Sequence, residues 1–462
     1  MIQGDLSSLR RGSGASSSKA GSFRGSWRGS AGHWRYGKDR ACKKEDDQVL
    51  TGRLVAELKM EELTTSSAVI AGEARITNCA YAASYSLNDE KPFKMIVPGQ
   101  PAVWRPPPLP CRLPGDSGDY MRDHNGARFP DHPIQPAVQA LFSLNEAFDP
   151  SSIDIMGCAS TLGDIMRFVR SIDSTFRFDV EMVGNTLFFV RNCKNDVIPN
   201  VRGYGHSFLN AFTSSAPNSG TAKSHQRVVS YDFSDLKCLV RFECDGYLTS
   251  SDGLGAVVTE PQFNPSTSPS DSIDVQEAGM IVAQDLVLEI KTKSQAIGGI
   301  QKSDHLPRLW VRQIPYFVSA YHNRGTFQDV RVEDMRKDTA DWETQHQYDL
   351  KRFASTLRRM ISEVKQARHL NLEVYREGTG PLQLRERTGT LRQALPSAWK
   401  DRWAVGSGPS YERLTSGNDS DEDGETYPST RLSSDGSDDL ADDFSLDYTA
   451  CSPECGYCGH CA

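Results

Sequence analysis

Four residues in the middle of the chain have the types and spacing of a metal-assisted hydrolytic site. One residue separates Glu243 from Asp245, and one separates Glu289 from Lys291. Both pairs lie in segments of strand composition, and side chains two residues apart on a strand point the same way. Three converging carboxylates repel one another unless a cation lies among them. Because Mg²⁺ prefers carboxylate oxygens and keeps several waters, we predict a site for Mg²⁺ or Mn²⁺.

Such a site is typical of phosphodiester hydrolysis, in which the ion polarises the phosphoryl oxygen and lowers the pKa of the attacking water. We expect Asp245 and Glu289 to be the ligands, with Glu243 as a further ligand, directly or through water. Lys291 would orient or deprotonate the water and help to neutralise the phosphoryl oxygens. Gln313, on the next helix, is expected to reach into the same cleft.

The elements that would position these residues are strands and one helix. Apolar residues around Glu243 predict a strand at 239–247, and a second strand is expected over 281–290. A helix should precede Gln313, and Pro315 should stop it. Strand composition returns at 316–321 and at 326–332, on either side of the turn Asn323-Arg324-Gly325.

The order of these motifs resembles the PD-(D/E)XK nuclease superfamily, and most of all its decapping and exoribonuclease family of the DXO type. The resemblance is carried by Glu243-Cys244-Asp245, by Glu289-Ile290-Lys291-Thr292, and by Trp310 and Gln313 before a strand. It implies an α/β fold with a central mixed sheet flanked by helices. It also implies a metal-dependent nuclease that acts on RNA or nucleotide ends.

One feature of that family is missing here. The family has a further metal-binding Glu in a Gly-Tyr-x-Phe-Glu context, and the nearest match, Gly203 to Leu209, ends in Leu209. An alternative is therefore a catalytically silent protein that binds nucleic acid or a partner through a nuclease-like fold. The interval from Asp245 to Glu289 is also longer than in the family, with an exposed insertion loop expected at 249–274.

A third class is a geranylgeranyl diphosphate synthase, a label that chains of this layout often carry. The segment Asp438-Asp439-Leu440-Ala441-Asp442 is formally a DDxxD match. Prenyl synthases, however, need two such motifs that face each other in an all-helical bundle. Here the match lies in an acidic linker, and the chain is rich in segments of strand composition. We therefore interpret the match as a chance occurrence.

Composition divides the 462 residues into a folded middle and polar ends. We expect a disordered basic arm at 1–47, a single nuclease-like domain at 48–400 with its core at 200–335, and an acidic disordered linker at 401–450. The arm has Arg interleaved with aromatic residues, a composition typical of nucleic-acid contact or simply of a solvated tail. No signal peptide or membrane span is expected, so the protein should be intracellular, in cytoplasm or nucleus.

Four of the eleven cysteines are crowded at the end of the chain. They follow the spacing of a possible zinc knuckle over residues 451–462: Cys451, Cys455, Cys458 and Cys461. Four thiolates suit tetrahedral Zn²⁺, although the usual longer gap between ligand pairs is missing. The alternative is a surface thiol cluster. Oligomeric state has no signal in the sequence.

The remaining folded segments have ordinary structural patterns. Helices are expected at 133–148, at 162–169 and at 342–364, where apolar residues recur at helical spacing. A hairpin is expected around Gly184-Asn185. A closing hairpin is expected from 370–375 and 382–384.

Overall fold

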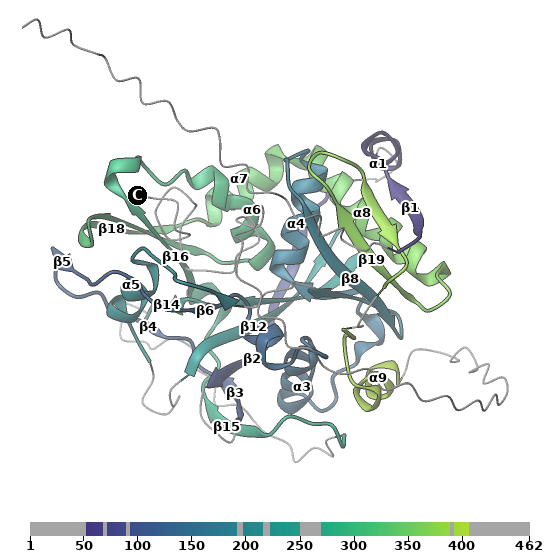
Figure 1. The fold of residues 1–462 in the computed structure, drawn as a ribbon, viewed down its shortest axis with the longest axis horizontal. Helices are drawn as coiled ribbons and strands as arrows, with labels where there is room; N and C mark the ends of the chain where they lie inside the picture. Colours follow the sequence, from purple (N-terminus) through teal and green to yellow (C-terminus); the bar gives the residue numbers. More distant parts are fainter. Residues whose placement is uncertain are drawn as a thin grey trace, which may run out of the picture. The chain divides into compact units, whose positions relative to one another are not determined.

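The computed structural model describes residues 52–67, 72–88, 93–191, 197–215, 222–249, 269–388 and 392–405. In this part of the chain two large β-sheets and a two-stranded ribbon are flanked by helices (Figure 1). Both large sheets mix parallel and antiparallel pairs, so the predicted mixed α/β fold is confirmed. The predicted basic arm, the zinc-type cysteines, and most of the insertion loop and acidic linker lie outside the described residues.

The larger sheet has eleven strands within the described residues. In spatial order they are β1 (Leu54–Leu58), β20 (Leu382–Arg385), β19 (Asn371–Arg376), β8 (Phe176–Val183), β9 (Thr186–Arg191), β7 (Ile155–Cys158), β13 (Leu236–Glu243), β12 (Ala222–Phe233), β2 (Ile76–Asn88), β3 (Met95–Gly99) and β15 (Val275–Gly279). Strands β8 and β9 form the expected hairpin, with Gly184 at φ +59° in the turn. Strands β19 and β20 form the closing hairpin.

The smaller sheet has seven strands within the described residues. Their spatial order is β11 (Thr213–Ser214), β4 (Val103–Trp104), β14 (Gly246–Tyr247), β16 (Val287–Ser294), β17 (Tyr316–Asn323), β18 (Thr326–Asp334) and β5 (Cys111–Arg112). The ribbon pairs β6 (Tyr120–Met121) with β10 (Val197–Ile198). The strand expected from residue 281 begins only at Val287, after the 3₁₀ turn Gln284–Leu286.

Helices lie on the faces of both sheets. They are α1 (Met60–Ser67), α2 (His124–Arg128), α3 (Gln135–Leu144), α4 (Ala159–Val169), α5 (Gly205–Phe212), α6 (Lys302–Arg312), α7 (Arg336–Gln345), α8 (Gln347–Gln366) and α9 (Ser397–Ala404), with further 3₁₀ turns at Pro150–Ser152 and Gln295–Ile297. The helix expected at 342–364 is divided into α7 and α8 at His346. Among the described residues, none of these helices is both long and apolar enough to span a membrane.

Strand β13 shows how the larger sheet separates two apolar cores. Val240 and Phe242 face a core shared with helices α4, α6 and α8. Leu239, which precedes Val240, faces the opposite core, which includes α3 and α9. Because side chains alternate along a strand, Arg241 and Glu243 lie on the same side as Leu239. The polar end of β13 therefore begins on the α3 side of the sheet.

Helix α9 extends the folded region beyond the boundary expected at residue 400. Trp399 and Trp403, four residues apart, are both 1% exposed and pack into the core on the α3 side. The Trp403 indole also donates to Thr186 Oγ1 at 2.9 Å. Acidic residues follow α9 in the sequence and assigned this segment to the linker, so the apolar face of the helix was not predicted. Helix α9 ends at Ala404, four residues beyond that boundary.

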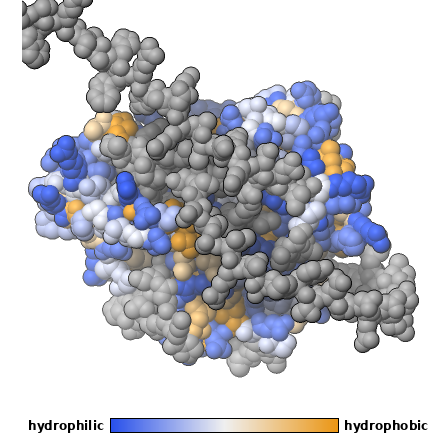
Figure 2. All heavy atoms as spheres, viewed as in Figure 1, coloured by the Kyte–Doolittle hydropathy of each residue, from blue (hydrophilic) through white to orange (hydrophobic). Residues whose placement is uncertain are grey.

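The surface and the fold can be compared with the predicted classes of function. On the face shown in Figure 2, most of the coloured atoms belong to hydrophilic residues, and apolar residues form small, separate patches. The two sheets are incompatible with the all-helical bundle of a prenyl synthase. The DDxxD segment at 438–442 lies outside the described residues.

Candidate active site

The predicted acidic residues meet where the chain passes from the larger sheet to the smaller one. Glu243 ends β13, and after only two intervening residues β14 joins the smaller sheet beside β16. Because Gly246 pairs with Leu288 in antiparallel register, Asp245 falls opposite Glu289. Asp245 Oδ2 accepts a hydrogen bond from the Ile290 amide at 2.7 Å. The structure thus brings Glu243, Asp245, Glu289 and Lys291 together at one junction.

Glu289 is surrounded by three positively charged side chains. Its Oε1 lies 3.1 Å from Lys291 Nζ and 3.0 Å from Arg308 Nε, and its Oε2 accepts from Arg312 Nη1 at 2.9 Å. The Glu289 side chain is 1% exposed. Burial alone would raise the pKa of this carboxyl, but the three cations hold the pKa below its ordinary range. Glu289 is therefore ionised at neutral pH.

Glu243 and Asp245 have the opposite electrostatic environment. Burial, together with the neighbouring Asp245, raises the pKa of Glu243 to about 8. Burial, together with Glu289, raises the pKa of Asp245 to about 7. Within the described part of the chain, the side chain of Glu243 forms no hydrogen bond or ion pair. A cation placed between these two carboxyls would relieve both the burial cost and their repulsion.

Lys291 is poised to exchange a proton near neutral pH. The residue is 3% exposed, and burial together with the nearby Arg308 lowers the pKa of its ammonium to about 8. Glu289 opposes this shift by favouring the charged form. An amine with a pKa close to the working pH can both hold a water and accept its proton. This is the property that the predicted role of Lys291 requires.

A divalent ion fits only part of the predicted ligand set. Within the described residues, no group of three or more His, Cys, Asp or Glu converges as a metal site. Glu289 is engaged by cations, whereas Glu243 and Asp245 are the carboxyls that lack one. Mg²⁺ commonly binds one or two carboxylates and completes its shell with waters and substrate phosphates. Glu243 and Asp245 therefore fit a Mg²⁺ or Mn²⁺ ion, and Glu289 fits a positioning role.

The position of the missing family Glu lies on the other side of the smaller sheet. Leu209, on α5, packs against the apolar cluster that contains Leu288 and Ile290. Glu289 and Lys291 alternate with these residues and so point to the opposite face of β16. A carboxylate at position 209 would lie on the apolar face rather than in the acidic cluster. The substitution to Leu therefore suits the packing of α5.

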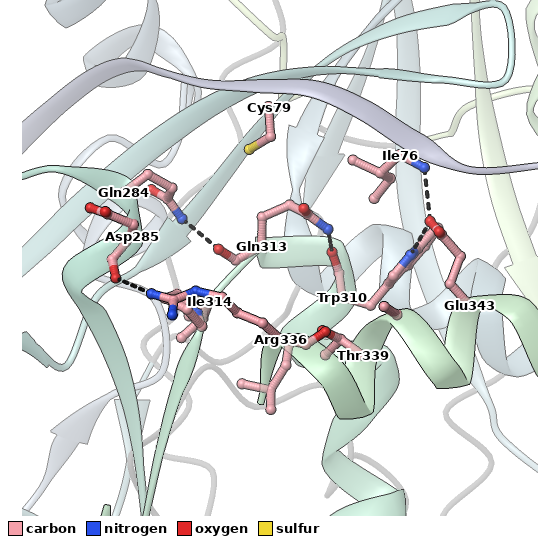
Figure 3. A pocket seen from close by; sticks show the side chains of 13 residues that line it. Ile76, Cys79, Gln284, Asp285, Trp310, Gln313, Ile314, Arg336, Thr339 and Glu343 are labelled. Carbon is pink, nitrogen blue, oxygen red and sulfur yellow. Dashed lines mark hydrogen bonds between the residues drawn. The ribbon is translucent and has the colours of Figure 1, made fainter. Parts of the chain in front are cut away.

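Gln313 does not join the cluster. It caps the C-terminus of α6 in the left-handed region, at φ +53°, and its amide donates to Trp310 O at 2.6 Å (Figure 3). It lines a separate pocket of about 410 Å³, together with Gln284 and Glu343. Residues on α6 change direction by about 100° per position, and the cap adds a further turn of the backbone. The structure therefore places Gln313 at this pocket and not among the residues that contact Glu289.

We predict that Gln313→Ala changes hydrolysis of RNA by less than about threefold, because a side chain bonded to its own helix contributes little to transition-state binding. Steady-state kinetics of the variant and wild type would measure this directly. A loss of more than about tenfold would instead place the Gln313 side chain at the reacting phosphate.

Sequence reasoning missed the two arginines of α6. Arg308 and Arg312 are four residues apart and share a helix face. Their spacing was visible in the sequence, but their partner Glu289 lies on a different element. Next to them, the half-buried His305 packs against Phe317 with the two rings tilted by 32° and their centroids 5.1 Å apart, and burial lowers the pKa of this His to about 3. His305 is therefore a neutral packing residue.

A second buried network adjoins the acidic cluster through β13. Arg241 Nη2 donates to Asp123 Oδ2 at 3.1 Å and lies 2.6 Å from Cys158 Sγ. Asp123 also accepts from the Asn125 amide at 2.9 Å and so caps α2. Burial opposes ionisation of Asp123, but Arg241 lowers its pKa. This network fixes the end of β13 from which Glu243 projects.

Comparisons with known proteins give one family and a group of structures. The model of the family described as "Domain of unknown function (DUF8563)" matches residues 58–382. No curated protein matches this chain.

Similar solved structures include Rai1 of S. pombe, with 12% identity, a TM-score of 0.47 and coverage of 70% of this chain and 98% of that chain. Candida albicans Rai1 in complex with pU5-Mn²⁺ has 10% identity and a TM-score of 0.47, and covers 76% of this chain and 99% of that chain. K. lactis Dxo1 in complex with manganese has 9% identity and a TM-score of 0.43, with 70% and 94% covered. These solved structures are proteins of the DXO type.

Proposed function

The chain belongs to the family described as a domain of unknown function (DUF8563), and we propose that it is a metal-dependent nuclease that hydrolyses phosphodiester or pyrophosphate bonds at the 5′ ends of RNA. The observation that carries this proposal is the register between β14 and β16. It sets Asp245 opposite Glu289, with Lys291 in contact with Glu289 at 3.1 Å. The choice of RNA rests on the resemblance of the motifs to the DXO type.

In this proposal Glu243 and Asp245 hold the ion through their carboxylates. A divalent ion there supplies charge that polarises the phosphoryl group and acidifies a water. Asp245 is fixed for this task by the Ile290 amide, which donates to Oδ2 at 2.7 Å. Ligand groups that are held before the substrate arrives need no reorganisation during the reaction.

Lys291 acts next to the ion as the group that orients the attacking water and accepts its proton. Its amine is held at Glu289 Oε1, so its position is fixed. Burial excludes bulk water from the side chain, which is 4% exposed. A pKa of about 8 lets part of the Lys291 population be unprotonated at pH 7 to 8. Glu289 is then a positioning residue for Lys291.

A second candidate function is binding of nucleic acid without catalysis. The observation that favours it is the saturation of Glu289 by Lys291, Arg308 and Arg312. If Glu289 were an obligatory metal ligand, these ion pairs would have to break. The two candidates differ in whether Glu243 and Asp245 alone suffice to hold the ion.

The decisive experiment is an assay of wild-type protein on a 5′-phosphorylated RNA oligonucleotide labelled at its 3′ end. We expect shortened products with Mn²⁺ or Mg²⁺ and intact RNA with EDTA, because the ion supplies the nucleophile and charge stabilisation. Mass spectrometry would identify the released nucleotides and hence the polarity. Intact RNA under all ion conditions, with RNA binding retained, would instead support the silent binder.

A further inference from the structure

The pocket at the C-terminal end of α6 is distinct from the acidic cluster and has a volume of about 410 Å³. Its walls come from β2, the 3₁₀ turn Gln284–Leu286, the end of α6 and helix α7 (Figure 3). Much of the wall is aliphatic and consists of Ile76, Leu309, Ile314, Pro315 and Ala340. A pocket of this size, with an apolar wall and a few polar groups, is typical of a site for a small organic molecule.

Most hydrogen-bond donors of the polar lining are already engaged within the protein. Gln284 Nε2 donates to Gln313 O at 2.9 Å, and Gln313 Nε2 donates to Trp310 O at 2.6 Å. Thr339 Oγ1 donates to Met335 O at 2.8 Å. The pocket therefore offers few donors to an anion or to a ligand rich in acceptors.

Several acceptors of the lining remain open. Glu343 Oε1 accepts from the Ile76 amide and from Trp310 Nε1, both at 2.9 Å, whereas Glu343 Oε2 has no partner within the described residues. Among the same residues, Gln313 Oε1 accepts no hydrogen bond, and the carboxylate of Asp285 forms no hydrogen bond or ion pair. A ligand that donates hydrogen bonds and carries positive charge would satisfy these groups.

Acidic groups outnumber basic groups at the pocket. The charged residues of the lining are Asp285, Arg336 and Glu343. Arg336 Nη1 lies 2.7 Å from Asp334 Oδ2, and its Nη2 donates to Asp285 O at 3.0 Å. The carboxylates of Asp334 and Asp285 both favour the charged form of this guanidinium. Three carboxylates therefore accompany one guanidinium, and the pocket favours a cation.

The placement of these groups indicates the shape of the cation. Figure 3 shows Asp285 and Glu343 at opposite ends of the lining, with Gln313 between them. One metal ion cannot contact both ends, and among the described residues no three His, Cys, Asp or Glu converge as a metal site. A stacked aromatic cation needs a free ring face, but Trp310 is only 2% exposed. A methylene chain with an ammonium at each end suits the aliphatic wall and the separated carboxylates.

We propose that this pocket binds a linear aliphatic diamine or polyamine, with one terminal ammonium at Glu343 and the other at Asp285. This inference goes beyond the proposed function and does not depend on it, because neither carboxylate belongs to the acidic cluster. The wall is held in place before the ligand arrives: Gln284 Oε1 accepts from buried Arg227 Nε at 2.6 Å. A secondary amine within the chain would donate to Gln313 Oε1.

The test is isothermal titration calorimetry of the full chain at physiological salt in EDTA. The probes are putrescine, hexamethylenediamine and spermidine, because the span between the two carboxylates selects the chain length. We expect the best of these amines to bind about tenfold or more tighter than hexylamine, which has one charged end. Hexanediol, which has no charge, should bind no better than hexylamine.

Two variants remove the proposed contacts. Glu343→Gln still accepts from the Ile76 amide and Trp310 but loses its charge, and it should weaken the best amine by about tenfold. Asp285→Asn, at an exposed position, should have a similar effect and be well tolerated. The matched control is Asp341→Asn, an exposed acid of α7 that pairs with Lys337, which should leave the affinity unchanged. Amines bound elsewhere on this acidic chain contribute equally to all of these proteins.

Alkylation of two thiols would locate the bound amine. Cys79 lines the pocket, whereas Cys111 lies on β5, and both are half-buried. At a free amine concentration of about ten times its dissociation constant, Cys79 should react about tenfold more slowly, and Cys111 should be unaffected. Equal slowing at both thiols, an unaffected Cys79, or undiminished affinity in both Glu343→Gln and Asp285→Asn would overturn the amine site. None of these measurements involves RNA hydrolysis, so they leave the proposed function to its own assay.

Discussion

Asp245→Asn should lower the rate of metal-dependent RNA hydrolysis by about 10³-fold, a loss comparable to removing a principal electrostatic group of an active site. Asparagine keeps the shape of the side chain and can still accept the hydrogen bond from the Ile290 amide. It cannot supply the negative charge that holds a divalent ion. Single-turnover cleavage of the 5′-phosphorylated RNA with saturating Mn²⁺ would measure the effect.

A matched control is Asp235→Asn. Asp235 lies in the turn between β12 and β13, is 68% exposed and pairs with Arg358. The same change of charge there should leave cleavage within about twofold of wild type, because exposed charges are screened by solvent. Wild-type rates in Asp245→Asn would show that the ion, if one is needed, is held elsewhere.

In the absence of a divalent ion, Asp245→Asn should stabilise the folded protein, although the same substitution lowers the rate of hydrolysis. The pKa of Asp245 in the folded protein is raised to about 7, above its ordinary value near 4. The folded state therefore binds the proton more tightly than the unfolded state, and stability falls as pH rises from about 4 to about 7. Above that window Asp245→Asn removes this loss, so we expect the variant to be more stable than wild type by up to about 4 kcal/mol at pH 8, because each of roughly three pKa units corresponds to about 1.4 kcal/mol.

Addition of Mn²⁺ should reverse that order. An ion that binds the folded state alone raises its stability according to concentration and affinity. Thermal melting at pH 8 should therefore show an ion-dependent increase in wild type that is small in Asp245→Asn. Equal ion-dependent shifts in both proteins would contradict the assignment of Asp245 as a ligand.

Strand periodicity made much of the cluster predictable. Glu289 and Lys291 alternate with Leu288 and Ile290, which face an apolar core, so their common direction follows from local sequence. The β8–β9 hairpin and helix α4 follow equally from local patterns. In such segments the spacing of apolar residues specifies both the element and its buried face.

Features that depend on distant pairing could not be predicted in this way. No local pattern shows that the chain leaves the larger sheet after Glu243 and joins the smaller one at Gly246. That exchange sets Asp245 opposite Glu289, 44 positions further along the chain. The pairing energy comes from backbone hydrogen bonds between distant strands, which have no signature in either segment alone.

Helix α6 illustrates a second reason for error. Gln313 and Arg312 are adjacent in sequence, but a helix directs neighbouring side chains to different sides. The contact with Glu289 therefore depends on the rotation of α6 about its axis. Leu309 and Trp310 fix that rotation because they are buried in the core, at 0% and 2% exposure. Because these apolar residues are buried, α6 is rotated so that Arg308 and Arg312, and not Gln313, face the cluster.

Glu289→Gln should destabilise the protein by about 3–5 kcal/mol at pH 7, the usual cost of breaking a buried ion pair by removing one partner. Glutamine nearly preserves the volume, so the effect isolates the charge. Without it, Lys291, Arg308 and Arg312 would repel one another with no carboxylate between them. Urea unfolding monitored by fluorescence would give the free energy of unfolding. An exposed counterpart, Glu386→Gln, breaks the ion pair with Arg53 and should produce no measurable change.

The pH dependence provides a separate check on the origin of this loss. The pKa of Glu289 is lowered in the folded state, because the three cations outweigh the effect of burial. Its ionised form therefore stabilises the fold fully above the ordinary pKa near 4.5, and the contribution declines as pH falls below that value. In acid the wild-type carboxyl becomes protonated and resembles glutamine. The difference between wild type and Glu289→Gln should thus shrink as the pH falls below about 4.5. A difference independent of pH would indicate that packing, rather than charge, makes Glu289 important.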